Sequence, residues 1–365
     1  GHGIYYGVGG VTSSNGNVTL SGYSSSSNAG YYGIYSNARS VSAANGSVIF
    51  QGAKIASASS GSGYLVNAAQ NITGGVPDPI YATADAGNPV FAASKGIYWS
   101  GAISANTSSG YIQINAKAPD ISGNMTAYGL VLQGNNQSYS LTGVGSITAL
   151  AASLGTGSLT YSNSGPLTIG SYGGISGITA GTVNLTAAGL QGSNNISTTG
   201  GTITFNPASG SYKYSGVITG GVALSKSGTG TQVLSGASSF TGATSITGGV
   251  LRVTNSGGLG SSAGATTISS GAALEISGGI TLGDALTISG TGISSSGAVR
   301  SLSGVNILSG NITLAAASEI QVDAGSLSIT PSAGNAFTGA YGLTVQSDGN
   351  LTIGGVIATG VGSLT

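Results

Sequence analysis

Eight acidic side chains are the residues of this chain best suited to acid–base chemistry. Hydrolysis of a polysaccharide needs two carboxylates that converge on one bond. Only two pairs are near in sequence, Glu319 with Asp323 and Asp78 with Asp85. The acids are otherwise scattered, at Asp78, Asp85, Asp120, Glu275, Asp284, Glu319, Asp323 and Asp348. Positions in turns or at the rim of the fold explain this distribution better than a catalytic pair does.

Residues for nucleophilic or metal chemistry are scarce. The single histidine is His2, and the chain has no cysteine. A serine nucleophile needs a base beside it, and a zinc site needs a set of His or Cys ligands. The GGxGxDxxx series that binds calcium in repeat toxins is missing as well. We therefore predict no catalytic residue, no metal site and no cofactor.

Aromatic side chains recur at one position of a repeat in the first third of the chain. Tyr5, Tyr35 and Tyr98 follow a glycine at equivalent places, and Trp99 comes directly after Tyr98. Stacked repeats would align such residues in a ladder. If the ladder faces outward, these four residues are candidate carbohydrate contacts. If it lies along or inside the wall it is packing, which we consider the simpler interpretation.

Asn-x-Ser/Thr sequons form a second group of candidate sites. Asn17, Asn45 and Asn71 are candidate glycosylation sites in the first part of the chain. The same pattern recurs at Asn106, Asn124, Asn184, Asn195, Asn311 and Asn350. Turn asparagines that precede threonine-rich strands produce the pattern by composition alone. Both interpretations stay open.

The composition of the 365 residues limits the class of protein. The chain has 68 glycines, 7 prolines, 4% charged residues and a mean hydropathy of +0.29. Collagen would need glycine at every third position, and a disordered chain would need low hydropathy and high charge. Eight basic and eight acidic residues cancel, so neither a nucleic-acid partner nor a polybasic membrane contact is expected. No run is long enough for a membrane-spanning helix. This composition favours a densely turned all-β protein.

The first third of the chain repeats at intervals of about thirty residues. The segment 11–22 (VTSSNGNVTLSG) matches the segment 41–52 (VSAANGSVIFQG) in pattern. A repeat of this size cannot bury its own apolar face, so it must stack on its neighbours. We therefore expect one vertical ladder made of residues that follow the repeat-starting glycines, namely Ile4, Ile34, Tyr64, Ile97 and Leu130. From residue 71 to 95 the pattern loosens around Pro77, Pro79 and Pro89, which predicts a loop or lateral extension.

The stretch from Leu224 to Val253 is the most regular part of the chain. Its short apolar runs, at 233–234, 244–246 and 250–253, are too short for helices and rich in β-branched residues. Each therefore reads as a strand, and the intervening glycines supply tight turns.

From Ser227 to Val253 the order of glycines, apolar residues and Phe240-Thr241-Gly242 resembles the strand repeat of autotransporter passenger domains. Gln232 stands where that family usually has an apolar residue. The first half resembles filamentous-haemagglutinin-type exoproteins of two-partner secretion, on segments such as 11–22. These resemblances imply a secreted β-solenoid that is a segment of a large bacterial surface protein.

We predict an all-β fold, a right-handed parallel β-helix with a coil every twenty to thirty residues. Residues 1–206 would carry the thirty-residue repeats, and residues 207–365 the autotransporter-like repeats, continuous with the first. The expected function is the stalk of an extracellular adhesin on the bacterial outer surface, without enzymatic activity. Self-association, flanking repeats of the same chain, and host or cell-surface glycans or proteins are the expected partners. A self-assembling surface fibre or sheath is the alternative, and a carbohydrate-active β-helix enzyme is the alternative of a different class.

Overall fold

In the computed structural model, strand backbone is described between residues 4 and 121. Backbone and side chains together are described at residues 14, 111–115, 125–142, 145–358 and 362–365. Every regular element in these parts is a β-strand. The chain divides into two compact units, Gly1–Gly181 and Thr182–Thr365, and β21 (Ile178–Ala187) runs through the boundary. The predicted all-β, parallel β-solenoid is confirmed in each unit.

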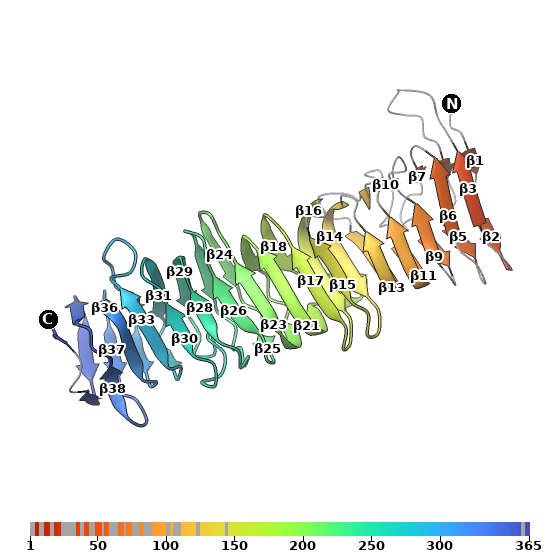
Figure 1. Cartoon of the computed structure of the whole chain (residues 1–365). Helices are drawn as coiled ribbons and strands as arrows, with labels where there is room; N and C mark the ends of the chain where they lie inside the picture. The colour runs from red at the N-terminus through yellow and green to blue at the C-terminus, as the bar shows by residue number, and fades with distance from the viewer. Residues whose placement is uncertain are drawn as a thin grey trace. The chain divides into compact units, whose positions relative to one another are not determined.

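The first unit consists mainly of parallel strands in three columns (Figure 1), together with one antiparallel pair, β19 (Ser171–Tyr172) and β20 (Ile175–Ser176). The first column is β1 (Ile4–Tyr6), β4 (Ile34–Ser36), β7 (Ile55–Ser57), β10 (Ile80–Ala82), β12 (Ile103–Ser104), β14 (Met125–Gln133) and β16 (Gly145–Ser153). The second is β2 (Val11–Ser13), β5 (Ser40–Ala43), β8 (Leu65–Ala68), β11 (Val90–Trp99) and β13 (Tyr111–Ile121), followed by the second halves of β14 and β16 and by β18 (Pro166–Ile169). The third is β3 (Val18–Gly22), β6 (Val48–Gly52), β9 (Asn71–Gly74) and the second halves of β11 and β13. β15 (Tyr139–Thr142) pairs with β17 (Ser158–Ser162).

The early repeats stack in the register that the sequence predicts. Val11 pairs with Val41 and Val18 with Val48, so the two matched segments lie on each other residue by residue. Ile4 likewise pairs with Ile34. The equivalence of the segments 11–22 and 41–52 is therefore confirmed on their described strands.

The predicted five-residue ladder is wrong beyond its first two members. Ile34 pairs with Ile55, whereas Ile97 pairs with Ile72 in the third column and Leu130 with Ile112 in the second. The coil shortens from the 30 residues between Ile4 and Ile34 to the 21 between Ile34 and Ile55. Residues chosen at a constant spacing of about thirty therefore fall in different columns. Tyr64 lies outside the described residues.

The loop or extension predicted over residues 71–95 is also wrong, because three strands of the solenoid lie there. In β9, Ile72 pairs with Val48 of the preceding coil. In β10, Ile80 pairs with both Ile55 and Ile103, and β11 begins at residue 90. Pro77, Pro79 and Pro89 fall between these strands in the sequence and lie outside the described residues. The pairing of coils therefore continues through β9, β10 and β11.

The second unit is also built of parallel strands in columns, and its third column begins only at residue 281 (Figure 1). Its first column is β23 (Ile196–Phe205), β26 (Ala223–Lys226), β28 (Thr244–Ile246), β30 (Thr266–Ile268), β33 (Leu286–Gly290), β36 (Ile312–Val322), β38 (Asn335–Thr338) and β41 (Val356–Ile357). Its second is β24 (Ser211–Tyr214), β27 (Thr231–Leu234), β29 (Gly249–Val253), β31 (Ala272–Ser277), β34 (Val299–Ser303), the second half of β36 and β39 (Leu343–Ser347). A third column begins with β32 (Thr281–Leu282) and continues through β35 (Val305–Leu308), β37 (Ser326–Ile329) and β40 (Asn350–Ile353).

The core of the second unit is a set of vertical ladders of inward-facing side chains. One buried ladder comprises Ile203, Leu224, Thr244, Thr266, Leu286, Ile312 and Phe337. Its steps run from 20 residues (Leu224 to Thr244) to 26 (Leu286 to Ile312). Each fully buried Ile, Leu or Phe stabilises the fold by about 1.5–3 kcal/mol. Apolar side chains fill this ladder except at Thr244 and Thr266.

Candidate functional site

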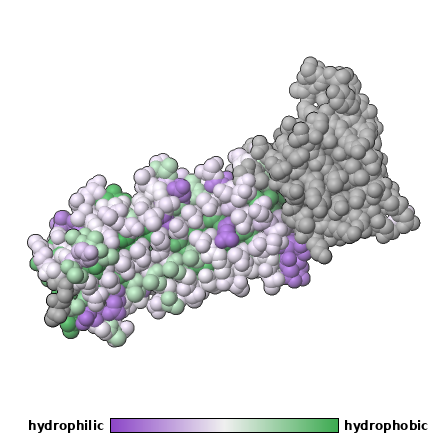
Figure 2. Space-filling model, in the orientation of Figure 1, coloured by the Kyte–Doolittle hydropathy of each residue, from purple (hydrophilic) through white to green (hydrophobic). Residues whose placement is uncertain are grey.

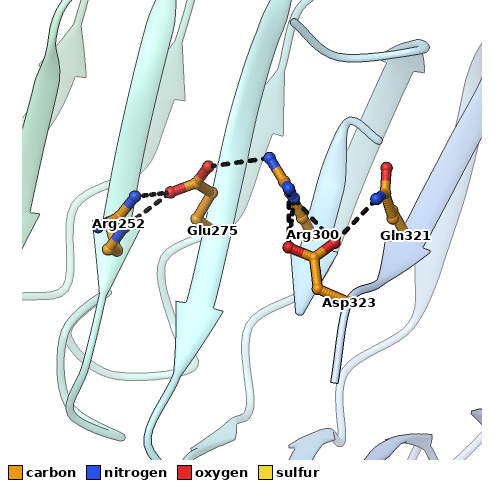
Figure 3. Close-up of polar contacts among 5 residues, drawn as sticks. All are labelled: Arg252, Glu275, Arg300, Gln321 and Asp323. Carbon is orange, nitrogen blue, oxygen red and sulfur yellow. Dashed lines mark hydrogen bonds and ion pairs between the residues drawn. The ribbon is translucent and has the colours of Figure 1, made fainter. Parts of the chain in front are cut away.

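A row of charged side chains crosses four neighbouring coils of the second unit. Arg252 in β29 pairs with Glu275 in β31, Glu275 with Arg300 in β34, and Arg300 with Gln321 in β36. Asp323 comes directly after β36, and its carboxylate contacts Arg300 (Figure 3). We call Arg252, Glu275, Arg300, Gln321 and Asp323 the charge ladder. Parallel pairing in register places their side chains above one another on the outer side of the sheet.

The charge ladder consists of two hydrogen-bonded ion pairs, Arg252–Glu275 and Arg300–Asp323, and a longer ion-pair contact of 3.9 Å between Glu275 and Arg300. Arg252 donates through Nε to Oε2 of Glu275 at 2.7 Å, and its NH2 lies 2.6 Å from the same oxygen. Arg300 donates through Nε to Oδ1 and Oδ2 of Asp323 at 3.0 and 2.8 Å. Gln321 donates through Nε2 to Oδ1 of Asp323 at 2.8 Å. The hydrogen bond that Arg300 donates to Asp323 raises the pKa of Arg300 above its ordinary value, against a smaller lowering by partial burial.

The strength of these pairs is limited by solvent. The side chains of Arg252 and Arg300 are 37% and 30% exposed, whereas that of Glu275 is 8% exposed. Partly exposed pairs of this kind contribute about 0–1 kcal/mol each. The ladder therefore aligns neighbouring coils more than it stabilises them. On the face shown in Figure 2, most of the coloured surface is pale and purple patches are few, in keeping with 4% charged residues.

A pocket of about 180 Å³ lies beside the charge ladder. It is lined by Val250, Ala273, Glu275, Ile293, Ser294, Ser296 and Arg300. Ala273 and Glu275 face outward from β31 and are nonetheless buried, because the segment 291–297 crosses over them. This pocket is where accessible polar groups and an apolar surface meet in the described part of the second unit.

The repeat 224–253 contains a buried lysine. Lys226 points inward between Phe205 and Ile246, and its side chain is fully buried. Its Nζ donates to the carbonyl oxygens of Ser227, Gly228 and Gly248, at 2.7, 3.0 and 2.8 Å. Burial lowers the pKa of Lys226 to about 8, even though these bonds satisfy the ammonium group. The ammonium thus ties together the turns of two successive coils.

Gln232 is the second buried polar residue of this repeat. Its Oε1 accepts a hydrogen bond from the backbone N–H of Leu190 at 2.9 Å, and its Nε2 donates to the carbonyl of Leu190 at 3.0 Å. Nε2 also lies 3.3 Å from the carbonyl oxygen of Tyr212 and 3.2 Å from that of Val233. The amide therefore satisfies both backbone groups of a residue two coils away. An apolar residue at this position would remove both of these hydrogen bonds.

Two further acids are buried away from solvent. Asp284 and Glu319 are 4% and 3% exposed, and one carboxyl oxygen of each, Oδ1 and Oε1, has no hydrogen-bond partner. Burial raises the pKa of Asp284 to about 7, against a smaller lowering by a backbone hydrogen bond, and burial also raises the pKa of Glu319. Neither is accessible to a polysaccharide, and Glu275 and Asp323 are occupied by guanidinium groups. No group of three or more His, Cys, Asp or Glu that could hold a metal ion occurs among the residues that the structure describes.

The candidate carbohydrate contacts lie in the part of the chain where only strand backbone is described. Tyr5 pairs with Tyr35, and Tyr35 pairs next with Ala56. Tyr98 and Trp99 belong to β11, where they pair with Thr73 and Gly74. The register therefore brings Tyr5 and Tyr35 together and places the other two aromatics in a different column. The contact of these residues with carbohydrate stays a prediction.

Three of the sequon asparagines, Asn184, Asn195 and Asn311, make side-chain hydrogen bonds between coils. Asn184 and Asn195 accept hydrogen bonds from the backbone N–H groups of Thr202 and Val217, at 3.2 and 3.0 Å. Asn311 donates through Nδ2 to the carbonyl oxygens of Ala333 and Asn335, at 3.1 and 2.6 Å. These bonds give the asparagines a structural role. Asn17 and Asn45 lie outside the described residues, and Asn71 begins β9, where only backbone is described, so their glycosylation stays a prediction.

Sequence reasoning missed the charge ladder, although a signal for it exists. Arg252 and Glu275 are 23 residues apart, and so are Arg300 and Asp323. In a chain with so few charges, opposite charges spaced by one coil length indicate stacked ion pairs. The buried roles of Lys226 and Gln232 have no comparable signal, because their partners are backbone groups.

Two comparisons with known proteins match part of this chain. A family model described as passenger-associated-transport-repeat matches residues 224–253, which carry Lys226, Gln232 and the strands β26 to β29. The adhesin BmaC autotransporter of Brucella suis biovar 1 (strain 1330) is 31% identical over 165 residues, which are 45% of this chain and 4% of that protein. No solved structure was found that matches the chain, and neither match supports the resemblance of the first half to two-partner-secretion exoproteins.

Among the described residues there is no helix with the length and apolarity to cross a bilayer. The chain spans a small fraction of the curated relative, and it is similar to autotransporter passengers in the repeat at 224–253.

Proposed function

We propose that this chain is a section of the passenger of a bacterial surface adhesin, where it acts as an extracellular β-solenoid stalk without enzymatic activity. The observation that carries the proposal is the passenger repeat at residues 224–253. Its strands pair in parallel register with the coils before and after it. A stalk needs only mechanical continuity, which parallel ladders supply through backbone hydrogen bonds between coils. Attachment, biofilm formation or cell–cell contact would then be the task of other parts of the protein that the stalk presents.

The enzyme alternative has little support in the described acids. A carbohydrate-active site needs a pair of accessible carboxylates on either side of the scissile bond. Asp284 and Glu319 are buried, and Glu275 and Asp323 share Arg300 as an ion-pair partner. A screen for turnover of pectin, alginate and related glycans tests this part of the proposal. Turnover that is lost on replacing one of these acids would establish an enzyme.

The partners of the stalk are proposed on physical grounds. Tyr341, Val356 and Leu364 lie in the last two described coils and are 49%, 65% and 55% exposed. Flanking repeats of the same chain or another copy of the chain would cover these side chains, and the fibre alternative corresponds to the second case. Contacts with host or cell-surface glycans or proteins are proposed for the surface of the stalk.

A distance measurement on living cells tests the stalk. The 365 residues are fused upstream of an autotransporter translocation barrel, and a cysteine is introduced at the exposed Ser209, since the chain has no other cysteine. Energy transfer from this label to a dye in the outer membrane reports its distance from the cell. Removing residues 224–311 deletes four coils, from Leu224 to the residue before Ile312. At about 4.8 Å per coil the label should approach the membrane by about 19 Å.

The matched control is a label at Ser332, which lies after the deleted coils and should not move. A label at Ser209 that stays at the same distance after the deletion would contradict the stalk. A label that is never reached by reagents on intact cells would contradict the surface location.

A further inference from the structure

The pocket beside the charge ladder has a preformed wall. The segment 291–297 is closed on itself, because the N–H of Gly297 donates to the carbonyl of Thr291 at 2.9 Å and that of Ser296 to Ile293 at 3.1 Å. Ser294 and Ser295 at its tip have φ angles of 52° and 55°, a region that residues other than glycine seldom occupy. Such a conformation persists only where the surroundings fix it. The segment therefore holds its shape over β31 and keeps the pocket open.

The polar side of the pocket offers one acceptor and one donor that do not satisfy each other. Oε2 of Glu275 is taken by Arg252, whereas Oε1 lies 3.9 Å from NH1 of Arg300. That separation is too long for a direct hydrogen bond. The opposite edge of the Arg300 guanidinium is bound to Asp323. A ligand group that both accepts and donates can bridge Oε1 and NH1, and a hydroxyl group does this with one atom.

The charge of the site selects against ionic ligands. Two arginines and two acids of the charge ladder cancel, so an anion or a cation entering the pocket would lose hydration without meeting an unpaired charge. The hydroxyls of Ser294 and Ser296 add neutral donors and acceptors at the opposite wall. Val250, Ala273 and Ile293 supply an apolar floor. A suitable ligand has several hydroxyls on its rim and carbon-bound hydrogens on its face.

The size of the pocket sets an upper bound on the ligand. Sites for drug-sized molecules have volumes of roughly 300–1,000 Å³, and this one has about 180 Å³. It therefore accepts one ring and excludes an oligosaccharide chain. We propose that the pocket between the charge ladder and the segment 291–297 binds a single neutral hexose ring, such as the terminal sugar of a glycan. This proposal does not depend on the stalk function.

Titration of the intact chain with methyl glycosides of glucose, galactose and mannose tests the proposal, with saturation-transfer and chemical-shift NMR as readouts. We expect saturable binding of at least one glycoside, with a Kd of about 1 mM. Ala273→Leu should fill the floor of the pocket and weaken that binding at least tenfold. Ala208→Leu, the same change at an exposed position outside the pocket, should leave it unchanged. Ser296→Ala removes one hydroxyl from the wall and should weaken binding about threefold to tenfold. This variant replaces Ala273→Leu as the test if Ala273→Leu does not fold.

Three results would overturn the proposal. The first is no saturable binding of any of the three glycosides up to about 10 mM, ten times the expected Kd. The second is binding that survives both Ala273→Leu and Ser296→Ala in folded protein. The third is tenfold tighter binding of glucuronate or glucosamine, because it would mean that the ligand is charged.

Discussion

Replacing Gln232 by leucine tests whether the buried amide holds the coils together. Leucine is close to the residue type that usually stands at this position of the repeat, so the change brings the sequence nearer to the family pattern. Gln232 is fully buried, and its amide is the hydrogen-bond partner of both the N–H and the C=O of Leu190. The variant keeps an inward-facing side chain and removes both bonds. We expect it to be less stable in spite of its better match to the family.

The size of the loss follows from the groups left unpaired. A buried backbone group without a partner costs about 1–3 kcal/mol, so the two groups of Leu190 together cost roughly 2–6 kcal/mol. Burial of the leucine side chain returns about 1.5–3 kcal/mol. At the midpoints of the two ranges, the net effect is a decrease in the free energy of unfolding on the order of 2 kcal/mol.

Denaturant unfolding and amide hydrogen exchange measure the two consequences separately. The midpoint of unfolding should fall, and the exchange of the Leu190 N–H should accelerate more than that of its neighbours. Leu234→Met, on the same strand and also inward-facing, is the matched control, because it changes packing without removing a hydrogen bond and should cost less than about 1.5 kcal/mol. A Gln232→Leu variant as stable as the parent, with the Leu190 N–H still protected, would refute the reasoning.

Three further predictions concern pH, backbone and association. The pKa of Asp284 in the folded state is about 7, above its ordinary value of 3.8. The contribution of Asp284 to stability is therefore complete below about pH 4 and is lost as the pH rises through 7. Asp284→Asn should flatten this pH dependence and stabilise the protein at pH 8 in thermal melts. Gly249→Ala should lower the melting temperature more than Gly271→Ala, since both positions have positive φ but only at Gly249 would a Cβ lie 2.4 Å from two carbonyl oxygens; equal losses would contradict this. The isolated chain should associate at micromolar concentration, because its net charge is zero and its last two described coils expose apolar side chains; a monodisperse monomer in light scattering would contradict association and favour the isolated stalk.

The sequence carried enough information for the fold because the fold is repetitive. The short apolar runs at 233–234, 244–246 and 250–253 predicted strands, and β27, β28 and β29 contain those positions. The stacking of segment 11–22 on segment 41–52 followed from identical patterns. Coil length was harder to predict, because it varies from coil to coil while the local sequence patterns look alike. The same variation moved Ile97 and Leu130 out of the predicted ladder.

The candidate site was less accessible to sequence reasoning than the fold. The charge ladder depends on pairing between residues one coil apart, so it becomes visible only once the coil length is known. The pocket depends on the path of the segment 291–297 over β31, which no pattern in the sequence encodes. The role of Gln232 leaves no signal in the sequence, because its partner is the backbone of Leu190, which is the same for any residue type at position 190.

The buried polar groups also explain how neighbouring coils find one alignment. Inner ladders of Ile, Leu and Val distinguish weakly between the native register and one displaced by two residues, because aliphatic side chains would again meet aliphatic side chains. Lys226 and Gln232 do distinguish them, since a displaced coil would remove the carbonyl of Gly248 as a partner of the ammonium and the backbone of Leu190 as the partner of the amide. An unpaired buried charge or amide is costly, so the wrong register is penalised far more than the native one is stabilised. The repeat at 224–253 thus has a physical reason to keep two polar residues inside an otherwise apolar ladder, and Gln232→Leu should broaden the NMR signals of the neighbouring strands as well as lower their stability.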